Sequence, residues 1–448
     1  MSKNIGFISP RFAGIDGVSL EASKWADVLE RNGHTCYWFA GELDREPRNS
    51  MLVPEAHFQH SRIHWITGQV FSNTKVPLAV FELIADLKSV LKSKLEKFVA
   101  QFNIDLLIVE NALSIPLNIP LAVALTELIS QSKLPTIAHH HDFYWERDRF
   151  AVNGIGDYLA RYFPPDLPSI NHVVINSAVR EDFAARKKIL AATIPNVLDF
   201  ENPPAPVYNG VEKFHSTFNL KPQDRVVLQP TRVIRRKGIE HAVELVKALD
   251  NRHFKLVISH ETGDEGYDYA DKLYALAAAK GVDLHVPRKS IHSPWLHSRM
   301  NGNGFNLWNV YPAAEFVTFP SLYEGFGNAL LEAVYFKKPV LINRYAAFIK
   351  DIEPKGFDFI KMNGVVTAHT VAAVKQILKS PERRATMVNR NYEIARRHYS
   401  YSSLEKRLNY LIHGSFNANM RPATTHRRTC PTGRIQSREC RNLSKIAV

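Results

Sequence analysis

Short apolar segments alternate with amphipathic segments along most of the chain, and this alternation limits the fold more than any other feature. Residues 4–10 predict a strand, residues 18–33 an amphipathic helix that ends at a glycine, and residues 34–41 a second strand. A helix at 81–102 and a strand at 104–110 follow. Strands that alternate with helices are typical of parallel, doubly wound sheets, so we expect an α/β fold.

The alternation stops once and then resumes. Residues 202–210 (NPPAPVYNG) are rich in proline and predict a connection between two domains. We therefore expect two Rossmann-like domains facing each other across a cleft, because ligands of such sheets bind at the carboxyl ends of the strands. The expected boundaries are 1–203 for the N-terminal domain, 204–381 for the C-terminal domain, 382–413 for closing helices and 414–448 for a basic tail without apolar periodicity, which we expect to be disordered.

Composition and charge exclude several classes of protein. The chain of 448 residues is 45% hydrophobic and 23% charged, as in ordinary globular proteins. Three cysteines are too few for a disulfide framework, and the N-terminus shows no signal-peptide pattern, so we expect a cytoplasmic protein. Of the net charge of +13, the last 34 residues carry +6, which leaves only a mildly basic folded part and no reason to expect a nucleic-acid partner. No segment predicts a membrane span, although the lysine-rich face of the helix at 81–102 leaves room for peripheral membrane contact.

A basic motif in the second half lies at an expected strand end. In TRVIRRKG, Arg232 and Lys237 occupy the loop between a strand and a helix. Two cations beside a helix N-terminus suit phosphate groups, while a solvated basic turn is the alternative. The chain has no Asp-x-Asp pair to hold a metal-bound nucleotide, so these cations and helix N-termini would have to carry the charge of a phosphate leaving group without a metal.

A second motif, PSLYEGFGNALLEA, follows another expected strand. Gly325 and Gly327 allow the backbone to come close to a ligand, and the helix that follows directs its first N–H groups at the same place. Glu324 on the loop and Glu332 on the helix are candidates to accept hydrogen bonds from sugar hydroxyls. The alternative is a capping carboxylate followed by an exposed helix glutamate.

Together the two motifs resemble the signature of the retaining glycosyltransferases of family 4, which have the GT-B fold. That signature pairs an Arg and a Lys five positions apart with two glutamates eight positions apart, and the resemblance extends in element order over about residues 4–412. It implies that Arg232 and Lys237 hold a nucleotide diphosphate. It also implies that Glu324 contacts the donor sugar and Glu332 the ribose. The backbone implied to lie along the sugar and phosphates is that of Gly325, Phe326, Gly327 and Asn328.

The first domain resembles the family at two strand ends. In FAGIDGVS, Asp16 and Gly17 stand where the family commonly has two glycines. The resemblance implies that Gly17 approaches the donor phosphates and that Asp16 has another role, such as a contact with the acceptor. In IAHHHDFYW the resemblance implies that His141 lies beside the donor sugar, as a catalytic residue with Arg232, Lys237 and Glu324. A loop glycine without a ligand and a packed structural histidine are the alternatives. Alternation of strand side chains prevents the three consecutive histidines from converging on a metal.

Other polar and aromatic residues near these strand ends are candidates for acceptor contacts. Aromatic faces stack on the carbons of sugars or glycerol-like groups, although the same side chains could instead pack the hinge between the domains. The candidate acceptor residues are Asp16, Glu110, Asn111, Asp142, Tyr144 and Trp145.

These implications define the expected activity. We expect an enzyme that transfers a hexosyl group, glucosyl or mannosyl, from a UDP- or GDP-linked sugar to a hydroxyl acceptor, with retention of configuration and without a metal or other cofactor. Small polar, saccharide and lipid-linked acceptors all remain open, and the stretch at 284–290, expected near the nucleobase, does not identify the base. The alternatives are a sensor or partner subunit that binds a nucleotide sugar without transfer, and a sugar-nucleotide epimerase.

Overall fold

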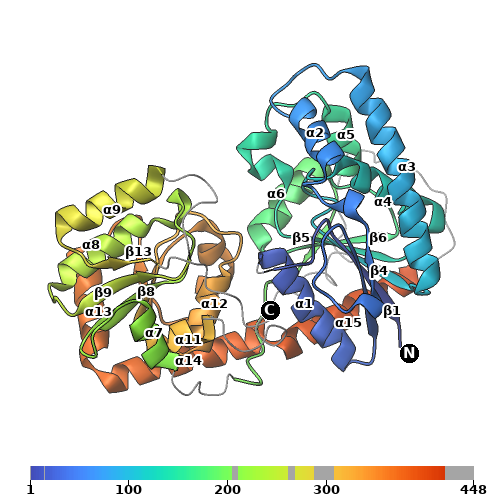
Figure 1. The fold of residues 1–448 in the computed structure, drawn as a ribbon. Helices are drawn as coiled ribbons and strands as arrows, with labels where there is room; N and C mark the ends of the chain where they lie inside the picture. The colour runs from blue at the N-terminus through green and yellow to red at the C-terminus, as the bar shows by residue number, and fades with distance from the viewer. Residues whose placement is uncertain (1, 15, 204–209, 261–267, 287–306, 419–448) are drawn as a thin grey trace, which may run out of the picture. The chain divides into compact units, whose positions relative to one another are not determined.

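The computed structural model describes residues 2–14, 16–203, 210–260, 268–286 and 307–418, which form two compact units (Figure 1). Unit 1 contains Met1–Pro195 and the chain from Leu404, and unit 2 contains Asn196–Ser403. The composition had placed the first boundary near residue 203 and had given the terminal helices a segment of their own. In the structure these helices are divided between the units, because α14 (Pro381–Tyr399) lies in unit 2 and most of α15 (Tyr401–Ala418) in unit 1.

The expected connection and tail are described only in part. Residues 204–209 lie outside the described residues, as do 419–448. Helix α15 continues through 414–418, which corrects the expected start of the tail. Among the described residues, no helix combines the length and apolar character needed to cross a membrane.

Unit 1 is built on a parallel sheet with the strand order β3-β2-β1-β4-β5-β6-β7. Its strands are β1 (Asn4–Ile8), β2 (Thr35–Ala40), β3 (Ser50–Leu52), β4 (Leu106–Glu110), β5 (Thr136–His140), β6 (Ile170–Val174) and β7 (Ala191–Thr193). Its helices besides α15 are α1 (Gly17–Arg31), α2 (Ser61–Val70), α3 (Leu78–Gln101), α4 (Ile119–Ser132), α5 (Gly156–Tyr162) and α6 (Ser177–Lys187).

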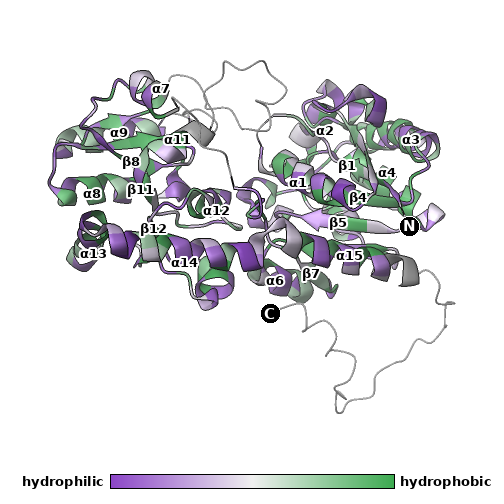
Figure 2. Cartoon of the chain, turned by 90° about the horizontal axis from the view of Figure 1, so that it is seen from below, coloured by the Kyte–Doolittle hydropathy of each residue, from purple (hydrophilic) through white to green (hydrophobic). Residues whose placement is uncertain are grey.

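Helix α3 illustrates how the sequence pattern produces the packing. Its buried residues recur every three or four positions from Val80 to Phe98, so one stripe of the helix faces the core that it shares with α4. Each of these side chains contributes about 1.5–3 kcal/mol relative to an exposed position. The lysines occupy the remaining circumference, and the helix accordingly changes between hydrophilic and hydrophobic colours along its length (Figure 2).

Unit 2 repeats the arrangement with the strand order β10-β9-β8-β11-β12-β13, again parallel throughout. Its strands are β8 (Arg225–Gln229), β9 (Phe254–Ile258), β10 (Leu284–His285), β11 (Ala314–Phe319), β12 (Val340–Asn343) and β13 (Ile360–Met362). Its helices besides α14 are α7 (Gly210–Thr217), α8 (Ile239–Leu249), α9 (Asp268–Lys280), α11 (Leu307–Ala313), α12 (Asn328–Tyr335) and α13 (Ala368–Lys379). Its core lies between the sheet and helices such as α8, whose Ile239, Val243 and Val246 are buried.

The two sheets share one topological feature that locates candidate sites. In each sheet the chain adds two strands on one side of its first strand and then continues on the other side, which places the reversal between β1 and β4 in unit 1 and between β8 and β11 in unit 2. Open parallel sheets bind ligands outside the carboxyl ends of the strands at such a reversal. The fold prediction of two Rossmann-like sheets is confirmed, and each sheet has one place where a ligand is expected.

Candidate active site

In unit 2, the loops that follow β8 and β11 are packed directly against each other. The Leu322 amide donates a hydrogen bond to the Arg236 carbonyl at 2.9 Å. Gly238 ends the first loop at φ +58°, and a Cβ at this position would lie 2.5 Å from the Pro320 carbonyl oxygen. Only glycine combines this backbone conformation with so close an approach. The two sequence motifs, about 90 residues apart, therefore form one site.

A buried ion pair joins the two motifs. Lys237 Nζ donates to Glu324 Oε1, and Arg236 Nη1 lies 3.2 Å from Glu324 Oε2. The Lys237 and Glu324 side chains are 12% and 9% exposed. Burial lowers the pKa of Lys237, as do the charges of Arg236 and Arg232, whereas the Glu324 carboxylate opposes the shift. Arg232, Lys237 and Glu324 are thus brought together as expected, and Arg236, which was not a predicted site residue, joins them.

The turn formed by residues 325–328, which follows Glu324, packs against aromatic side chains. Gly327 has φ +107°, and a Cβ there would lie 2.9 Å from the Tyr345 hydroxyl, which itself donates to the Phe326 carbonyl at 2.7 Å. The Phe326 side chain is buried, so only its backbone remains for a ligand. Helix α12 starts at Asn328, whose Oδ1 accepts from Asn196 Nδ2 at 2.6 Å. Helix α12 therefore begins four residues after Glu324, and its positive end lies next to this turn.

Glu332 lies on α12 one turn beyond Asn328. Its Oε2 accepts a hydrogen bond from the Tyr311 hydroxyl at 2.8 Å, and burial together with the Glu332 charge raises the pKa of Tyr311 well above its usual value. Glu332 is partly buried and has a fixed orientation. A contact between Glu332 and a ribose remains a prediction.

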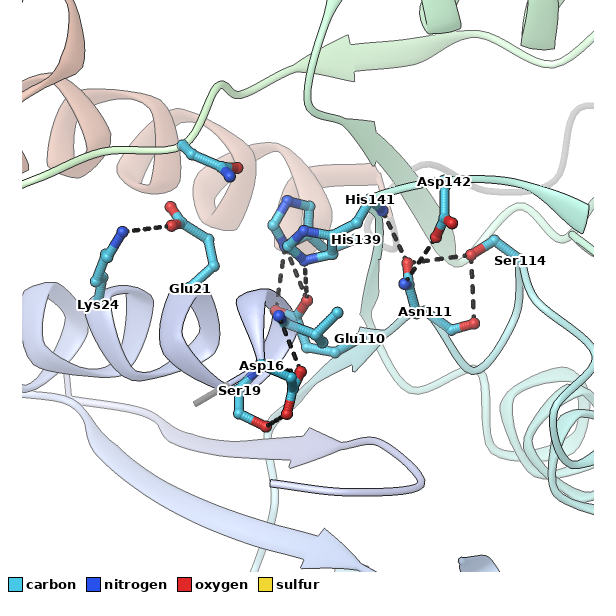
Figure 3. A network of polar contacts seen from close by, with 12 residues as sticks. Asp16, Ser19, Glu21, Lys24, Glu110, Asn111, Ser114, His139, His141 and Asp142 are labelled. Atoms are coloured by element: carbon cyan, nitrogen blue, oxygen red, sulfur yellow. Dashed lines mark hydrogen bonds and ion pairs between the residues drawn. The ribbon is translucent and has the colours of Figure 1, made fainter. Parts of the chain in front are cut away.

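In unit 1, three residues from two neighbouring strand ends meet at the reversal of the sheet. The carboxylate of Glu110, the last residue of β4, contacts two neighbouring imidazoles, with His139 Nδ1 and His141 Nε2 each 3.0 Å from its Oε2 (Figure 3). His140 points to the opposite face and contacts His172 at 2.9 Å. The predicted alternation of the three histidines is confirmed.

Burial and mutual contacts shift the pKa values of Glu110 and of its two histidine partners. Burial alone would raise the pKa of Glu110, but the charges and hydrogen bonds of His139 and His141 lower it. Burial lowers the pKa of His139 despite Glu110. For His141 the hydrogen bond and charge of Glu110 outweigh burial, so its pKa is raised. Glu110 is fully buried, which corrects the expectation that it contacts an acceptor directly.

Helix α1 adds a second buried ion pair to this region. Glu21 and Lys24 are 0% and 5% exposed, and Lys24 Nζ lies 2.8 Å from Glu21 Oε2. The neighbouring Trp25 stacks on His139 with ring centroids 4.2 Å apart. The Glu21 charge raises the pKa of both His139 and His141. The sequence reading did not include these α1 residues, because their helical spacing is that of an ordinary packed face.

Asp16 and Gly17 begin α1. Asp16 is the N-cap residue: its Oδ1 accepts from the amides of Val18 and Ser19, both at 3.1 Å. Its other oxygen accepts from the Ser19 hydroxyl at 2.6 Å and lies 3.2 Å from Arg11 Nη2. The carboxylate is therefore used locally to start the helix, a role that the sequence did not predict for it. A contact of Asp16 with an acceptor remains a prediction. The exposed Gly17 is the first residue of α1.

Asn111 and Asp142 shape the turn that carries His141. Asn111 Oδ1 accepts from the His141 amide at 2.8 Å, and Asn111 Nδ2 donates to Asp142 Oδ1 at 3.1 Å. Asp142 also pairs with Arg147. These contacts fix the direction in which the His141 ring leaves the end of β5.

The aromatic candidates pack within unit 1. Trp145 stacks on Phe143 with centroids 4.4 Å apart, donates from Nε1 to Asp182 Oδ2 at 2.7 Å, and has the Arg186 guanidinium 5.5 Å from its ring centre. Tyr144 is partly buried against the main core of the unit. These contacts favour the packing alternative over stacking on an acceptor.

The Glu110, His139 and His141 donor atoms all lie within 4.8 Å of one another, as a metal site would require. A metal on His139 Nδ1 would move the ring proton to Nε2, which is buried and has no hydrogen-bond partner among the described residues. Histidines that bind metals normally donate that second N–H to an acceptor. With Nδ1–H donated to Glu110, no buried donor is left unpaired. These residues fit a hydrogen-bonded network better than a metal centre.

Comparisons with known proteins agree with this geometry. The model of the family described as glycosyl transferases group 1 matches residues 211–394, which contain both motifs of unit 2. Over 441 residues the chain is 31% identical to a mannosylglucosylglycerate synthase of Thermotoga maritima, covering 90% of this chain and 97% of that protein. The chain belongs to the glycosyl transferases group 1 family.

Two further matches support this group 1 glycosyltransferase assignment. A mannosylglucosylglycerate synthase of Petrotoga mobilis is 32% identical over 387 residues, covering 80% of this chain and 86% of that protein. Among solved structures, Anabaena HepE in complex with UDP and glucose matches with a TM-score of 0.60 at 14% identity, covering 92% of this chain and 100% of that one. The structural match shows that this glycosyltransferase has the two-domain GT-B fold.

The stretch at 284–290, which was expected near the nucleobase, is described only in part, because residues 287–290 lie outside the described residues.

Proposed function

We propose that this protein is a retaining, metal-independent mannosyltransferase that uses a nucleotide diphosphate sugar and a small anionic acceptor of the glucosylglycerate type. The observation that carries the donor half of this proposal is the Lys237–Glu324 ion pair, set between the ends of β8 and β11. The names of the two relatives carry the acceptor half, since a mannosylglucosylglycerate synthase forms a product that contains mannosyl, glucosyl and glycerate groups.

The cations of unit 2 suit the leaving group. As the bond between the sugar C1 and the β-phosphate oxygen breaks, negative charge grows on the phosphate. In this proposal Arg232, Lys237 and the start of α12 stabilise that charge. A cation about 4 Å away contributes about 4 kcal/mol at an effective dielectric of 20, before desolvation. Two such cations can do the work that a metal ion does in other nucleotide-sugar sites.

The transfer step conserves atoms and protons without a protein nucleophile. The acceptor hydroxyl oxygen forms a bond to C1 on the face from which the diphosphate leaves, and its proton passes to the departing phosphate oxygen. Glu324, which accepts from Lys237 and Arg236 in the structure, has the chemistry to accept from donor-sugar hydroxyls as well. In this proposal Glu324 positions the sugar, while Lys237 serves both the carboxylate and the diphosphate.

The experiment is nucleotide release by purified protein from GDP-mannose, GDP-glucose, UDP-glucose and ADP-glucose, each with and without glucosylglycerate. The expected result is acceptor-dependent release from GDP-mannose, with a mannosylated product whose anomeric configuration matches that of the donor. Release from a glucose-linked donor alone would refute the assignment of a mannosyl donor. An inverted product would refute the retaining mechanism. Donor binding without release would indicate a sensor, and an altered nucleotide sugar without acceptor consumption would indicate an epimerase.

A further inference from the structure

The buried charges at the sheet reversal of unit 1 balance only if one histidine is protonated. Lys24 and Glu21 neutralise each other at 2.8 Å, which leaves the fully buried Glu110 carboxylate without a formal counter-charge. Its hydrogen-bond partners are His139 and His141, both about 3.0 Å away. An isolated buried carboxylate is costly, so one imidazolium beside it is strongly favoured.

The hydrogen-bond partners show which histidine carries the charge. His139 Nε2 is buried and has no partner among the described residues. A protonated His139 would therefore bury an unpaired, charged N–H group, whereas a neutral His139 with its proton on Nδ1 leaves only an unused acceptor there. His141 is 11% exposed, so its second nitrogen is not confined in the same way. The extra proton therefore belongs on His141.

We propose that Glu110 is a positioning residue that keeps His141 as an imidazolium, with Nε2–H donated to Glu110 and Nδ1–H presented to an anionic oxygen of the substrate. No described residue accepts from His141 Nδ1, and the bond from the His141 amide to Asn111 fixes the start of the turn that aims the ring. His141 then acts as a charged hydrogen-bond donor and not as a general base. The inference rests on the proposed function only for the identity of that oxygen, which belongs to the nucleotide diphosphate or to the acceptor carboxylate.

The charged groups around His141 support this state from each neighbouring element. The end of β4 supplies Glu110, and α1 supplies Glu21 with its partner Lys24. Next to His141 itself lies Asp142, which Arg147 neutralises in part. Burial acts to lower the pKa of His141, but the combined effect of these groups raises it, and the hydrogen bond that His141 donates to Glu110 is the largest raising contribution.

The direct test measures the His141 proton without a reaction. We would label histidines at Cε1, assign the His141 signal with His141→Gln, and titrate the wild-type chain between pH 5 and 9. We expect His141 to titrate above the ordinary imidazole value of about 6.5. A wild-type His141 that titrates at or below that value overturns the proposal, whatever the enzyme's substrates prove to be.

Glu110→Gln tests the cause, because it preserves shape but removes the charge. We expect the His141 pKa to fall by at least one unit and the alkaline limb of the kcat profile to move with it, so that the loss of activity is about tenfold larger at pH 8 than at pH 6. Glu127→Gln, on the surface of α4 beside Lys88 and Lys92, is the matched control and should change neither quantity. Equal losses at all pH values would instead indicate a structural role and contradict the proposal.

Separate additions to the labelled wild-type protein identify the oxygen. GDP alone should shift the His141 signal if the ligand oxygen is a phosphate oxygen, and glucosylglycerate alone should shift it if the oxygen is a carboxylate. If neither addition, nor both together, changes the His141 signal or its titration, His141 does not face a substrate anion and the proposal fails.

Discussion

The two sheets have the same strand order around their reversal points but place opposite kinds of chemistry there. In unit 2, arginine and lysine side chains surround a single carboxylate on loops that are partly exposed, with Arg236 38% and Lys237 12% exposed. In unit 1, a fully buried carboxylate is enclosed by histidines and by a second ion pair on α1. A cationic loop cluster can exchange its internal partner for a phosphate, whereas the buried carboxylate of unit 1 holds the neighbouring His141 in one charge state.

The largest predicted difference between the units concerns activity. Lys237→Ala removes a largely buried cation of the unit 2 site, and we expect kcat to fall by about 10²–10³-fold, as when one preorganised donor is lost from a transition-state site. Steady-state kinetics with the donor that the nucleotide-release experiment identifies would measure it. The matched control is Lys255→Ala, which removes a lysine of β9 that pairs with Asp283. The kcat of this variant should stay within twofold of wild type. Similar kcat values for the two variants would show that the Lys237–Glu324 ion pair does not contribute to the reaction.

The same contrast explains what the sequence could predict. The site of unit 2 consists of two linear motifs, and each motif follows a strand whose apolar pattern is clear, so topology alone brings Arg232, Lys237 and Glu324 together. Several of the longer elements, such as β1, α1, α3 and β4, were predicted for the same reason, since five or more patterned residues carry a period. Helices α2, α6 and α13 were not predicted. The edge strands β3, β7, β10 and β13 have two or three residues each and were not predicted.

The cluster of unit 1 could not be predicted in the same way. Glu110, His139 and the Glu21–Lys24 pair come from β4, β5 and α1, and their side chains meet only through packing. In the sequence Glu110 resembled an exposed strand-end acid, and nothing in its neighbours indicated complete burial. Trp145 likewise resembled a sugar platform, because the sequence does not show that Phe143 and Arg186 already contact its ring.

The next largest effect concerns stability. Gly327→Ala places a Cβ at φ +107° and 2.9 Å from the Tyr345 hydroxyl, and we expect it to destabilise unit 2 by about 1–3 kcal/mol. Gly68→Ala in α2 of unit 1 is the control, because no atom lies within 4 Å of its added Cβ and alanine favours a helix. Thermal unfolding should show a lower transition for the first variant and an unchanged or slightly higher one for the second. A Gly327→Ala protein as stable as wild type would mean that the turn relaxes easily.

A smaller predicted effect is a pH dependence of the stability that Glu110 and His141 contribute to unit 1. Because the pKa of Glu110 is lowered on folding, its contribution to stability is present above the unfolded carboxyl value and is lost as pH falls through the folded value. Because the pKa of His141 is raised, its contribution is present below the unfolded imidazole value and is lost as pH rises through the folded value. The stability difference between wild type and Glu110→Gln should therefore be greatest, at about 1–2 kcal/mol, between about pH 4.5 and 6.5. Chemical denaturation across pH would show it, and a difference independent of pH would contradict this account of the cluster.

The smallest predicted effect decides whether the aromatic end of unit 1 belongs to its core or to its site. Trp145→Phe keeps a ring on Phe143 but removes the hydrogen bond to Asp182, which should cost about 1 kcal/mol of stability. Since the ring already contacts Phe143 and Arg186, we expect the KM for the acceptor to change less than twofold. Asp182→Asn, which keeps the ring but weakens the same hydrogen bond, should give a similar or smaller loss of stability and the same KM. A large rise in the acceptor KM with Trp145→Phe alone would show that the indole contacts the acceptor, and unit 1 would then recognise its ligand through its aromatic residues as well as through His141.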